Sequence, residues 1–426
     1  MKQMKYKKKD LGSYNVHMIQ TDKYKTITMR IVFRRKIKKE EITIRNILTS
    51  LLVQSSKEYN TKRKLTIKTQ DLYSIGVGAN NYRTGNYIHT IFSLNCLSDK
   101  YTEEGNFIES IKFLAEILFH PDVEENHFLE KNVDIVKNKA KNTLSSLKED
   151  ANSYSLIRAL ESFDKDSPLS YRMIGYLEDL DQINGENLYE YYKSILNSDL
   201  VDIFIIGDFR EDEVLKEIRK SFKFRILKKA KLDYRLKNKK TRTRRLFAKE
   251  TIKNTQSKVN MICRYHHLND YEINYVLPVY NVILGGGADS KLFKIVREEN
   301  SLCYGISSHP TKLDNILVID TGIDKNNFKK TVTLIEKIME DMKKGRFTDS
   351  DIDIAKQYFE TAYDEVEESP SSVLDIYMMK DFIGTDDLEI KRIMTNRVTK
   401  KEIIKVAKKI KMDTVFMLEG DKNEKE

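Results

Sequence analysis

Apolar residues recur along this chain with two different periods, which predict a mixture of strands and helices. Residues 26–33 read TITMRIVF, an alternation typical of a half-buried strand. Residues 106–119 place Phe, Ile, Leu and Ala at helical spacing and end before His120-Pro121, where a helix stops. The mixture of the two periods predicts an α+β fold.

The same two patterns predict the remaining elements. Strands are expected at 16–20, 26–33, 74–77, 79–83, 88–97, 202–206, 257–265, 305–308, 316–322 and 414–418. Helices are expected at 43–54, 65–72, 106–119, 124–149, 153–162, 187–196, 270–284, 328–342, 349–366, 373–382 and 400–409. A short helix with Leu292, Ile295 and Val296 on one side is expected after the glycines at 285–287.

Landmarks of the first half of the chain recur about 210–220 residues later. Asn106-Phe107 returns as Asn327-Phe328, and Gly207-Asp208 returns as Gly420-Asp421. We therefore expect one α+β unit used twice. The predicted domains are residues 1–224 and 250–426, joined by a connector at 225–249.

The bulk composition agrees with a packed globular protein. The chain has 426 residues, of which 40% are hydrophobic, so two domains are expected. It contains no run of about 18 apolar residues that could span a membrane. The lysine-rich segment 1–10 has no apolar core after it, so no signal peptide is predicted. We expect a cytoplasmic protein with no membrane partner.

One tract carries the net charge of +10. Residues 225–249 hold twelve Lys and Arg against one Asp, which leaves the rest of the chain close to neutral. The tract could be a patch that binds nucleic acid or a membrane, or a solvated connector. Its single Tyr and single Phe form no pattern suited to base stacking, so the connector is favoured and nucleic acid is disfavoured as a partner.

The cysteines and histidines give no strong metal signature. The three cysteines have no close pair and predict reduced thiols. His120, Glu124 and His127 have the spacing of one helix face, but Pro121 marks a helix start, so His120 is expected outside the helix. His266-His267 are interpreted as packing or surface residues.

The stretch from Leu284 to Tyr304 is the most informative in the sequence. It follows the pattern G-G-G-x-x-S-x-L-x-x-x-x-R-E-x-x-x-L-x-Y, from Gly285 to Tyr304. The glycines allow backbone to approach backbone or ligand closely. The pattern resembles the C-terminal half of the insulinase/pitrilysin-like (M16) zinc peptidases.

The resemblance covers nearly the whole chain and implies a fold and a site. It implies two similar halves, each a mainly antiparallel sheet with helices packed on one face, the duplicated LuxS/MPP-like metallohydrolase fold. It also implies that Arg297 and Tyr304 contact substrate, with Gly285, Gly286 and Gly287 as substrate-binding residues.

The chain departs from the family where zinc would be bound. The family carries H-x-x-E-H on a helix of its N-terminal half, with a distal Glu on a later helix. The corresponding positions here are Asn46, Thr49 and Ser50, with Lys137 near the distal slot. Asn and Ser are poor zinc ligands, and Thr49 cannot act as a general base. We expect no zinc or other cofactor in this chain.

The resemblance then implies a function shared between two chains. Some bacterial members of the family are heterodimers in which one chain carries H-x-x-E-H and the other the Arg/Tyr pair. We expect this chain to be the zinc-free subunit, with an H-x-x-E-H partner that holds zinc and with a peptide as substrate. The alternatives are a scaffold with no catalytic part, and a nucleic-acid-binding protein that uses residues 225–249.

Overall fold

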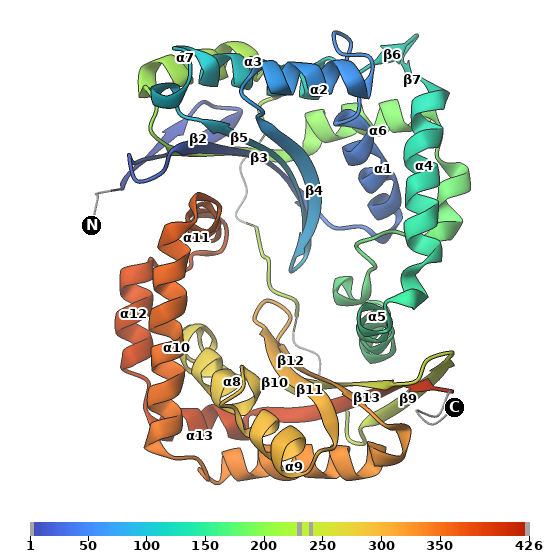
Figure 1. Ribbon diagram of the computed structural model, residues 1–426, viewed down its shortest axis with the longest axis vertical. Helices are drawn as coiled ribbons and strands as arrows, with labels where there is room; N and C mark the ends of the chain where they lie inside the picture. The colour runs from blue at the N-terminus through green and yellow to red at the C-terminus, as the bar shows by residue number, and fades with distance from the viewer. Residues whose placement is uncertain (1–3, 228–231, 238–241, 422–426) are drawn as a thin grey trace. The chain divides into compact units, whose positions relative to one another are not determined.

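The computed structural model describes residues 4–227, 232–237 and 242–421 and has the predicted α+β fold (Figure 1). Its strands are β1 (Lys5–Asp10), β2 (Tyr14–Gln20), β3 (Thr26–Lys36), β4 (Gly76–Thr84), β5 (Tyr87–Leu97), β6 (Val123–Glu124), β7 (His127–Phe128), β8 (Leu200–Gly207), β9 (Leu246–Ile252), β10 (Ser257–Tyr265), β11 (Cys303–Thr311), β12 (Ile316–Ile323) and β13 (Ile410–Gly420).

The α-helices are α1 (Ile42–Leu52), α2 (Lys62–Asp71), α3 (Asn106–Phe119), α4 (Glu130–Ser145), α5 (Ala151–Asp164), α6 (Gly185–Ser198), α7 (Glu211–Ser221), α8 (Leu277–Gly285), α9 (Phe328–Lys343), α10 (Asp349–Glu368), α11 (Pro370–Ile383), α12 (Leu388–Asn396) and α13 (Lys400–Lys408). Two π-helices are η6 (Glu272–Val276) and η7 (Phe293–Glu299). Short 3-10 turns are η1 (Lys39–Glu41), η2 (Asp99–Tyr101), η3 (Leu147–Glu149), η4 (Pro168–Ser170), η5 (Leu177–Gln182) and η8 (Lys325–Asn327).

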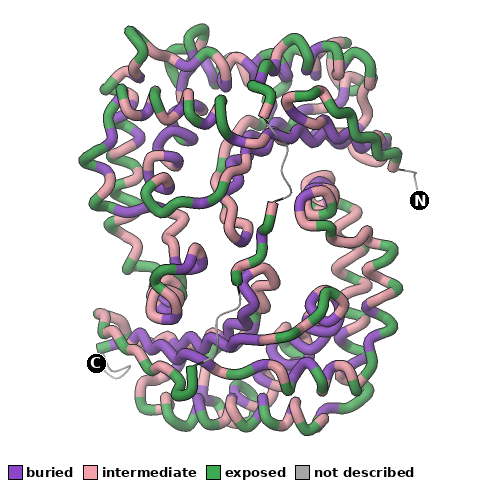
Figure 2. The backbone as a smooth tube through the Cα atoms, turned by 180° about the vertical axis from the view of Figure 1, so that it is seen from behind, coloured by how far each residue is buried: buried purple, intermediate pink, exposed green. Residues whose placement is uncertain are grey.

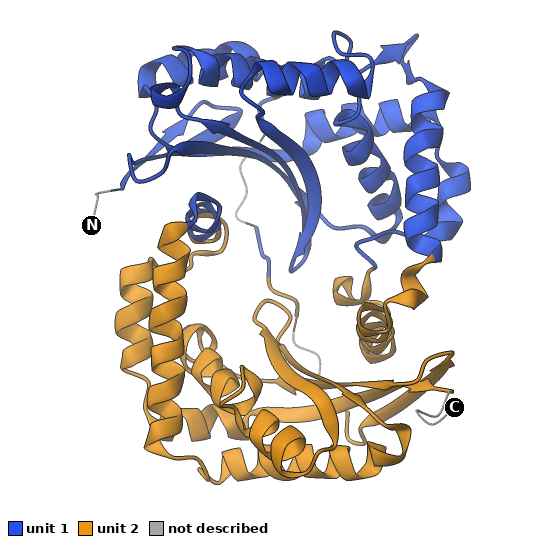
Figure 3. Cartoon of the chain, viewed as in Figure 1, with its two compact units in different colours: residues 1–145, 172–234, 369–378 blue, residues 146–171, 235–368, 379–426 orange. Residues whose placement is uncertain are grey.

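The chain forms two compact units that are not continuous in sequence (Figure 3). Unit 1 comprises residues 1–145, 172–234 and 369–378. Unit 2 comprises residues 146–171, 235–368 and 379–426. Relative to the predicted boundaries, each unit takes one segment from the other half: unit 2 contains α5, and unit 1 contains the first part of α11.

The two sheets have the same strand order, which confirms the predicted duplication. In unit 1 the order is β1-β2-β8-β3-β5-β4, and in unit 2 it is β11-β12-β10-β13-β9. Read from the other edge, β9, β13, β10, β12 and β11 match β2, β8, β3, β5 and β4. Each sheet is antiparallel except for one parallel pair, which is β2 with β8 in unit 1 and β9 with β13 in unit 2.

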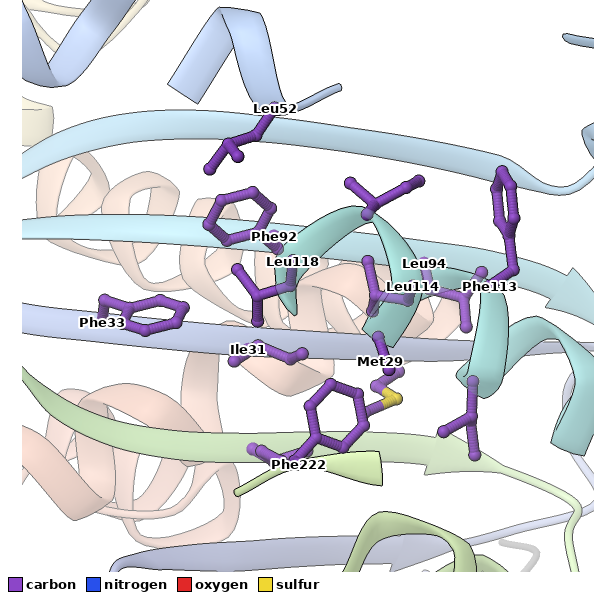
Figure 4. Packing of buried hydrophobic residues seen from close by; sticks show 14 of the residues in the cluster. Met29, Ile31, Phe33, Leu52, Phe92, Leu94, Phe113, Leu114, Leu118 and Phe222 are labelled. Carbon is purple, nitrogen blue, oxygen red and sulfur yellow. The ribbon is translucent and has the colours of Figure 1, made fainter. Parts of the chain in front are cut away.

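The core of unit 1 lies between its sheet and helices α3 and α7 (Figures 1 and 4). Alternate residues of β3 and β5 point toward α3, as the alternation in the sequence predicts. Burying each large side chain stabilises the unit by roughly 1.5–3 kcal/mol. The side chains labelled in Figure 4 are Met29, Ile31, Phe33, Leu52, Phe92, Leu94, Phe113, Leu114, Leu118 and Phe222.

The opposite face of this sheet mixes charged residues with buried apolar ones such as Val32 and Phe204. Arg30 on β3 forms an ion pair of 2.5 Å with Asp375 in the first part of α11. Arg34 pairs with the buried carboxylate of Asp202 on β8, to which His17 Nε2 also lies at 3.3 Å. Charged residues on alternate positions of β3 therefore keep this face distinct from the apolar core.

Unit 2 has helices on both faces of its sheet. Helices α8, α9 and α13 contribute to the larger apolar cluster. Helix α5 packs on the other face over β10 and β13, with Phe163 and Phe416 in a second cluster. Polar contacts hold α5 in register: Asn260 Nδ2 donates to Ser155 Oγ at 2.7 Å, and the Tyr154 hydroxyl donates to Glu250 at 2.6 Å. The inner strands of both sheets are mostly buried, whereas the edge strands β1, β4, β9 and β11 are mostly intermediate or exposed (Figure 2).

The predicted connector at 225–249 is only partly a connector. Residues 228–231 and 238–241 lie outside the described residues. Tyr234 is 3% exposed and its carbonyl accepts a hydrogen bond from the Asn86 N–H at 3.0 Å. Residues 246–249 begin β9, which pairs in parallel with β13. Of the basic residues in this tract, Lys249 lies on β9, an edge strand, where charged side chains are common because they discourage pairing with other chains.

Several local predictions differ from the structure. The helix predicted at 124–149 begins only at Glu130, because 123–128 form a small hairpin with Glu125 and Asn126 at positive φ. The strands predicted at 74–77 and 79–83 are one strand, β4. The sequence patterns did not predict β1, α7, β9 and α12, which are short and contain few apolar residues.

Candidate functional site

Arg297 lies on the π-helix η7 of unit 2. Leu292 and Val296 are fully buried and fix the helix to the core, while Arg297 is exposed. The guanidinium lies over the ring of Phe293, 4.4 Å from its centroid, and forms no ion pair with any described residue. Such stacking orients a guanidinium and leaves its N–H donors available. π-Helical turns are frequent at functional sites.

The turn after η7 brings the chain directly into β11. Asn300 Nδ2 donates to the Ile295 carbonyl at 2.9 Å, and the Leu302 N–H donates to the Val296 carbonyl at 3.0 Å. Ser301 between them has φ 50°. Leu302 is 4% exposed and anchors the start of the strand. Arg297 and Tyr304 are thus held on one continuous, well-packed segment.

A β-bulge turns Tyr304 outward. Cys303 pairs with Ile323 and Gly305 pairs with Gly322, so Tyr304 is an extra residue with no pairing residue on β12. Without this shift Tyr304 would share the buried face of Ile306, which is 7% exposed. Instead the Tyr304 side chain is 68% exposed. Bulges often re-aim a side chain next to an active site.

The neighbouring cysteine does not suit nucleophilic chemistry. Burial raises the pKa of the Cys303 thiol, an effect that a hydrogen bond with Thr321 and the charge of Arg297 oppose. The thiol therefore stays protonated at neutral pH, and the thiolate is the reactive form. The chemistry available at this surface comes from the guanidinium of Arg297 and the hydroxyl of Tyr304.

The three glycines have different surroundings. At Gly285 a Cβ atom would come within 2.6 Å of Ser308 Oγ, and at Gly286 within 2.6 Å of the Val282 Cα. Close packing of α8 against β11 therefore explains Gly285, and the close approach of the chain to the preceding turn of α8 explains Gly286. Gly287 is exposed and a Cβ atom there would meet nothing within 4 Å. Of the predicted substrate-binding glycines, Gly287 is the one with an exposed backbone.

The zinc-equivalent positions lie in unit 1, on α1, and are closed by hydrogen bonds. Asn46 Nδ2 donates to the Met173 carbonyl at 2.7 Å, and Asn46 Oδ1 accepts from Asn81 Nδ2 at 2.8 Å. Thr49 Oγ1 donates to the Arg45 carbonyl at 2.7 Å and accepts a hydrogen bond from Asn81 Nδ2 at 3.1 Å. Asn81 on β4 therefore ties both positions to the sheet.

A buried arginine lies next to these positions. Arg45 is fully buried; its Nε donates to Thr90 Oγ1 at 2.6 Å, and its guanidinium pairs with Asp199 at 2.5 Å. Thr90 Oγ1 in turn donates to Asn81 Oδ1 at 2.5 Å. Arg45, Thr90 and Asn81 form a chain of hydrogen bonds that leads to Asn46 and Thr49.

The residues at these positions do not fit a zinc ion. Ser50 is exposed, and the Lys137 ammonium on α4 donates to the Ile183 carbonyl at 2.6 Å. These positions thus carry a neutral amide and neutral hydroxyls, of which Asn46 and Thr49 already have hydrogen-bond partners, near a buried guanidinium and an ammonium. Zinc requires His, Cys or carboxylate ligands, and positive charge nearby opposes binding of a cation. No catalytic step can be assigned to this helix.

The alternative histidine cluster is not a helix face. His120 follows the last residue of α3, Glu124 lies in β6 and His127 in β7. The prediction that His120 lies outside a helix is confirmed. The expected position of Glu124 and His127 on a helix is wrong, because the hairpin replaces its first turn.

The sequence reading found Arg297, Tyr304 and the zinc-equivalent positions, but it missed the residues that support them. Arg45 and Asp199 form their pair across 154 residues of sequence, and Asn81 lies on a strand of alternating polar residues. The only signal in the sequence was a basic residue inside the apolar period of the helix at 43–54. Its burial depends on Asp199, which pattern alone cannot place.

Comparisons with known proteins agree with this picture. Residues 182–359 match the family model described as the peptidase M16 inactive domain. The chain is 26% identical over 413 residues to the "Probable inactive metalloprotease YmfF" of Bacillus subtilis, covering 96% of both chains. It is 25% identical over 262 residues to the "Uncharacterized zinc protease YmxG" of Bacillus subtilis, covering 60% of each.

A solved structure is similar over almost the full length. The crystal structure of a conserved protein from Enterococcus faecalis V583 has a TM-score of 0.91 and 27% sequence identity with this chain, covering 98% of this chain and 99% of that one. Separately, none of the described helices is long and apolar enough to cross a membrane.

Proposed function

This chain belongs to the M16 peptidase family, and from that premise we propose that it is the zinc-free subunit of a heterodimeric metallopeptidase. The observation that carries the proposal is a contrast within the chain. The zinc-equivalent helix α1 is closed by hydrogen bonds, whereas Arg297 and Tyr304 are exposed on η7 and β11. A chain with no catalytic part would not need the bulge that turns Tyr304 outward.

The roles of the two residues follow from the chemistry of peptide hydrolysis. Zinc bound in the partner would supply the activated water that attacks the scissile carbonyl. The Tyr304 hydroxyl donates a hydrogen bond to the oxyanion that then develops, an effect of roughly 10²-fold in rate. The Arg297 guanidinium holds a main-chain carbonyl of the substrate with two donors, which positions the peptide.

The partner in this proposal is a second M16-type chain that carries H-x-x-E-H. It contributes the metal and the general base, which Asn46, Thr49 and Ser50 cannot replace. The similarity to a relative named as a zinc protease supports the existence of such chains. The substrate is a peptide or an unfolded segment, because the exposed groups recognise main-chain carbonyls.

The proposal is tested with this chain, the H-x-x-E-H relative encoded in the same genome, and a mixture of the two. Each sample is assayed for peptide cleavage and analysed for metal. We expect cleavage only in the mixture, with zinc in the partner. Tyr304→Phe should lower kcat about 10²-fold and Arg297→Ala should raise KM, without loss of assembly.

Exposed residues of unit 2 outside the site provide matched controls. Tyr358→Phe and Arg397→Ala remove the same chemical groups from α10 and from the end of α12 and should leave cleavage unchanged. If the partner is fully active alone, or if Tyr304→Phe and Arg297→Ala are as silent as the controls, the chain is a scaffold. That alternative is also consistent with an inactive member of the family.

A further inference from the structure

Three polar side chains of unit 2 meet on the strand that carries Tyr304. Ser307 and His309 lie on β11, and Asp320 lies opposite Ser307 on β12. Ser307 Oγ is 2.9 Å from Asp320 Oδ1 and 3.0 Å from His309 Nε2. His309 Nε2 is 3.5 Å from the same Asp320 oxygen. None of these residues has a part in the role proposed for Arg297 and Tyr304.

The trio is on the outward face of the sheet. Ile306 and Ser308 point to the helices and are 7% and 0% exposed, so Ser307 and His309 point the other way. Helix α5 covers β10 and β13 on this face but leaves the edge open: the side chains of His309 and Asp320 are 69% and 47% exposed. The bulge places Tyr304 toward solvent at the start of the same strand.

The hydrogen bonds orient the Asp320 carboxylate, on which the charge of Lys258 on the neighbouring strand β10 also acts. Ser307 Oγ donates to Asp320 Oδ1, and His309 Nε2 lies beside both the Ser307 hydroxyl and this carboxylate oxygen, so the carboxylate is fixed in direction. The other oxygen, Oδ2, accepts no hydrogen bond from any described residue, and no described Lys or Arg lies within ion-pair distance of Asp320. The arrangement is not a nucleophile–base–acid relay, because the imidazole uses Nε2 toward both partners.

We propose that Asp320, oriented by Ser307 and His309, is a specificity-determining residue that binds a basic side chain of the peptide. The proposal rests on the proposed function, because it requires peptide to lie along the outward face of β11. Alternate residues of an extended chain are about 7 Å apart. The exposed carboxylate of Asp320 therefore lies within one or two peptide side-chain positions of Tyr304. Its negative charge suits Lys or Arg better than an acidic or apolar residue.

The test is peptide binding to this chain with and without its H-x-x-E-H partner, in which the motif Glu is changed to Gln to prevent turnover. Two fluorescent peptides that differ only in Lys or Gln at one position are compared by anisotropy, with the position scanned along the peptide. At one position, we expect the Lys peptide to bind about 3–5-fold more tightly. Asp320→Asn should remove this preference, and Ser307→Ala should reduce it.

Two controls keep the test specific. Asp353→Asn removes an exposed carboxylate from α10 of the same unit and should leave the preference intact. Circular dichroism checks that each variant folds. Equal binding of both peptides to the unmodified chain, a preference that survives Asp320→Asn, or absence of any peptide binding would each overturn the proposal.

A metal ion is the competing explanation, since imidazole and carboxylate are also metal ligands. A Lys preference that disappears with EDTA and returns with zinc would overturn a direct role of Asp320. Failure of the proposed function gives a different result: cleavage by the mixture would then be indifferent to Tyr304→Phe and Arg297→Ala. The two proposals can therefore fail independently.

Discussion

Unit 1 and unit 2 share one sheet topology and treat their polar residues in opposite ways. In unit 1, β4 pairs with β5 in unbroken register, and Asn81 on β4 bonds inward to Asn46 and Thr49 of α1. In unit 2, the matching edge strand β11 carries a bulge, and Tyr304 points outward. Helix α1, which follows β3, buries Thr43, Arg45 and Thr49 among apolar residues. The buried residues of α8, which follows β10, are mostly apolar and include one polar residue, Asn281.

The contrast shows how one fold can close off polar residues in one copy and leave others exposed in the second. Closing the unit 1 positions takes only neutral side chains that bond to one another. Keeping the unit 2 residues exposed takes irregular backbone, a π-helix and a bulge, which a merely structural copy has no need to retain. Irregular backbone in unit 2 is therefore the better guide to function than the closed network in unit 1.

The largest expected effect comes from breaking the network of unit 1. Arg45→Ala removes the fully buried partner of Asp199, which keeps only Arg35 at 2.5 Å. A buried charge that loses its partner is costly, so the free energy of unfolding should fall by about 3 kcal/mol. Urea denaturation measures the change, and hydrogen exchange should localise it to α1 and β5. An unchanged transition midpoint would show that the network does not stabilise unit 1.

The glycines of unit 2 give a matched pair of substitutions. Gly285→Ala places a methyl group 2.6 Å from Ser308 Oγ and 2.8 Å from Leu292 Cδ1, which should cost about 1–3 kcal/mol by overpacking. Gly287→Ala meets open space and should change stability by less than about 0.5 kcal/mol. Thermal unfolding compares the two. Equal effects would contradict the packing role assigned to Gly285.

Acid should act on unit 1 through His89. Burial, with the charges of Arg34 and Arg45, lowers the pKa of His89 to about 3. Because the unfolded chain takes up this proton near pH 6.5 and the folded chain does not, stability falls as pH drops below about 6.5, by at most about 1.4 kcal/mol per pH unit. His89→Gln should remove this slope in urea titrations from pH 7 to 5. His120→Gln, an exposed control, should keep it.

Alkali should act on unit 2 in the opposite sense through Lys312. Burial and the nearby charge of Lys391 lower the pKa of Lys312 to about 8. Between about pH 8 and 10.4 the unfolded chain binds more protons, so the stability of unit 2 should rise with pH in this range. Lys312→Met should flatten that rise. A rise that persists in the variant would assign it to other groups.

The smallest expected effect on stability belongs to the proposed site itself. Arg297→Ala removes an exposed guanidinium that, among the described residues, stacks on the Phe293 ring and forms no ion pair. The free energy of unfolding should therefore change by less than about 0.5 kcal/mol. Comparison with Arg45→Ala contrasts the stability effect of removing an exposed arginine with that of removing a buried one. A loss above about 1 kcal/mol would give Arg297 a structural role and weaken its functional one.

The sequence by itself determined the class of fold, its duplication and most of its elements. Apolar alternation defines β10 and helical spacing defines α3 to the residue, because both elements bury one face against a core. The pattern from Gly285 to Tyr304 could be read directly, because it depends on residue type and spacing. The resemblance then implies that Asn46 and Ser50 stand at the family's histidine positions and Thr49 at that of the general base.

Only the tertiary structure decided which side chains are exposed and which are closed off. The bulge that turns Tyr304 outward depends on the register between β11 and β12, and a shift of one residue moves a side chain to the other face. The burial of Arg45 depends on Asp199, and the orientation of Asp320 on Ser307 and His309. The Arg45–Asp199 pair joins residues that are distant in sequence, and the other contacts depend on how β11 and β12 pair. Local periodicity carries no information about either.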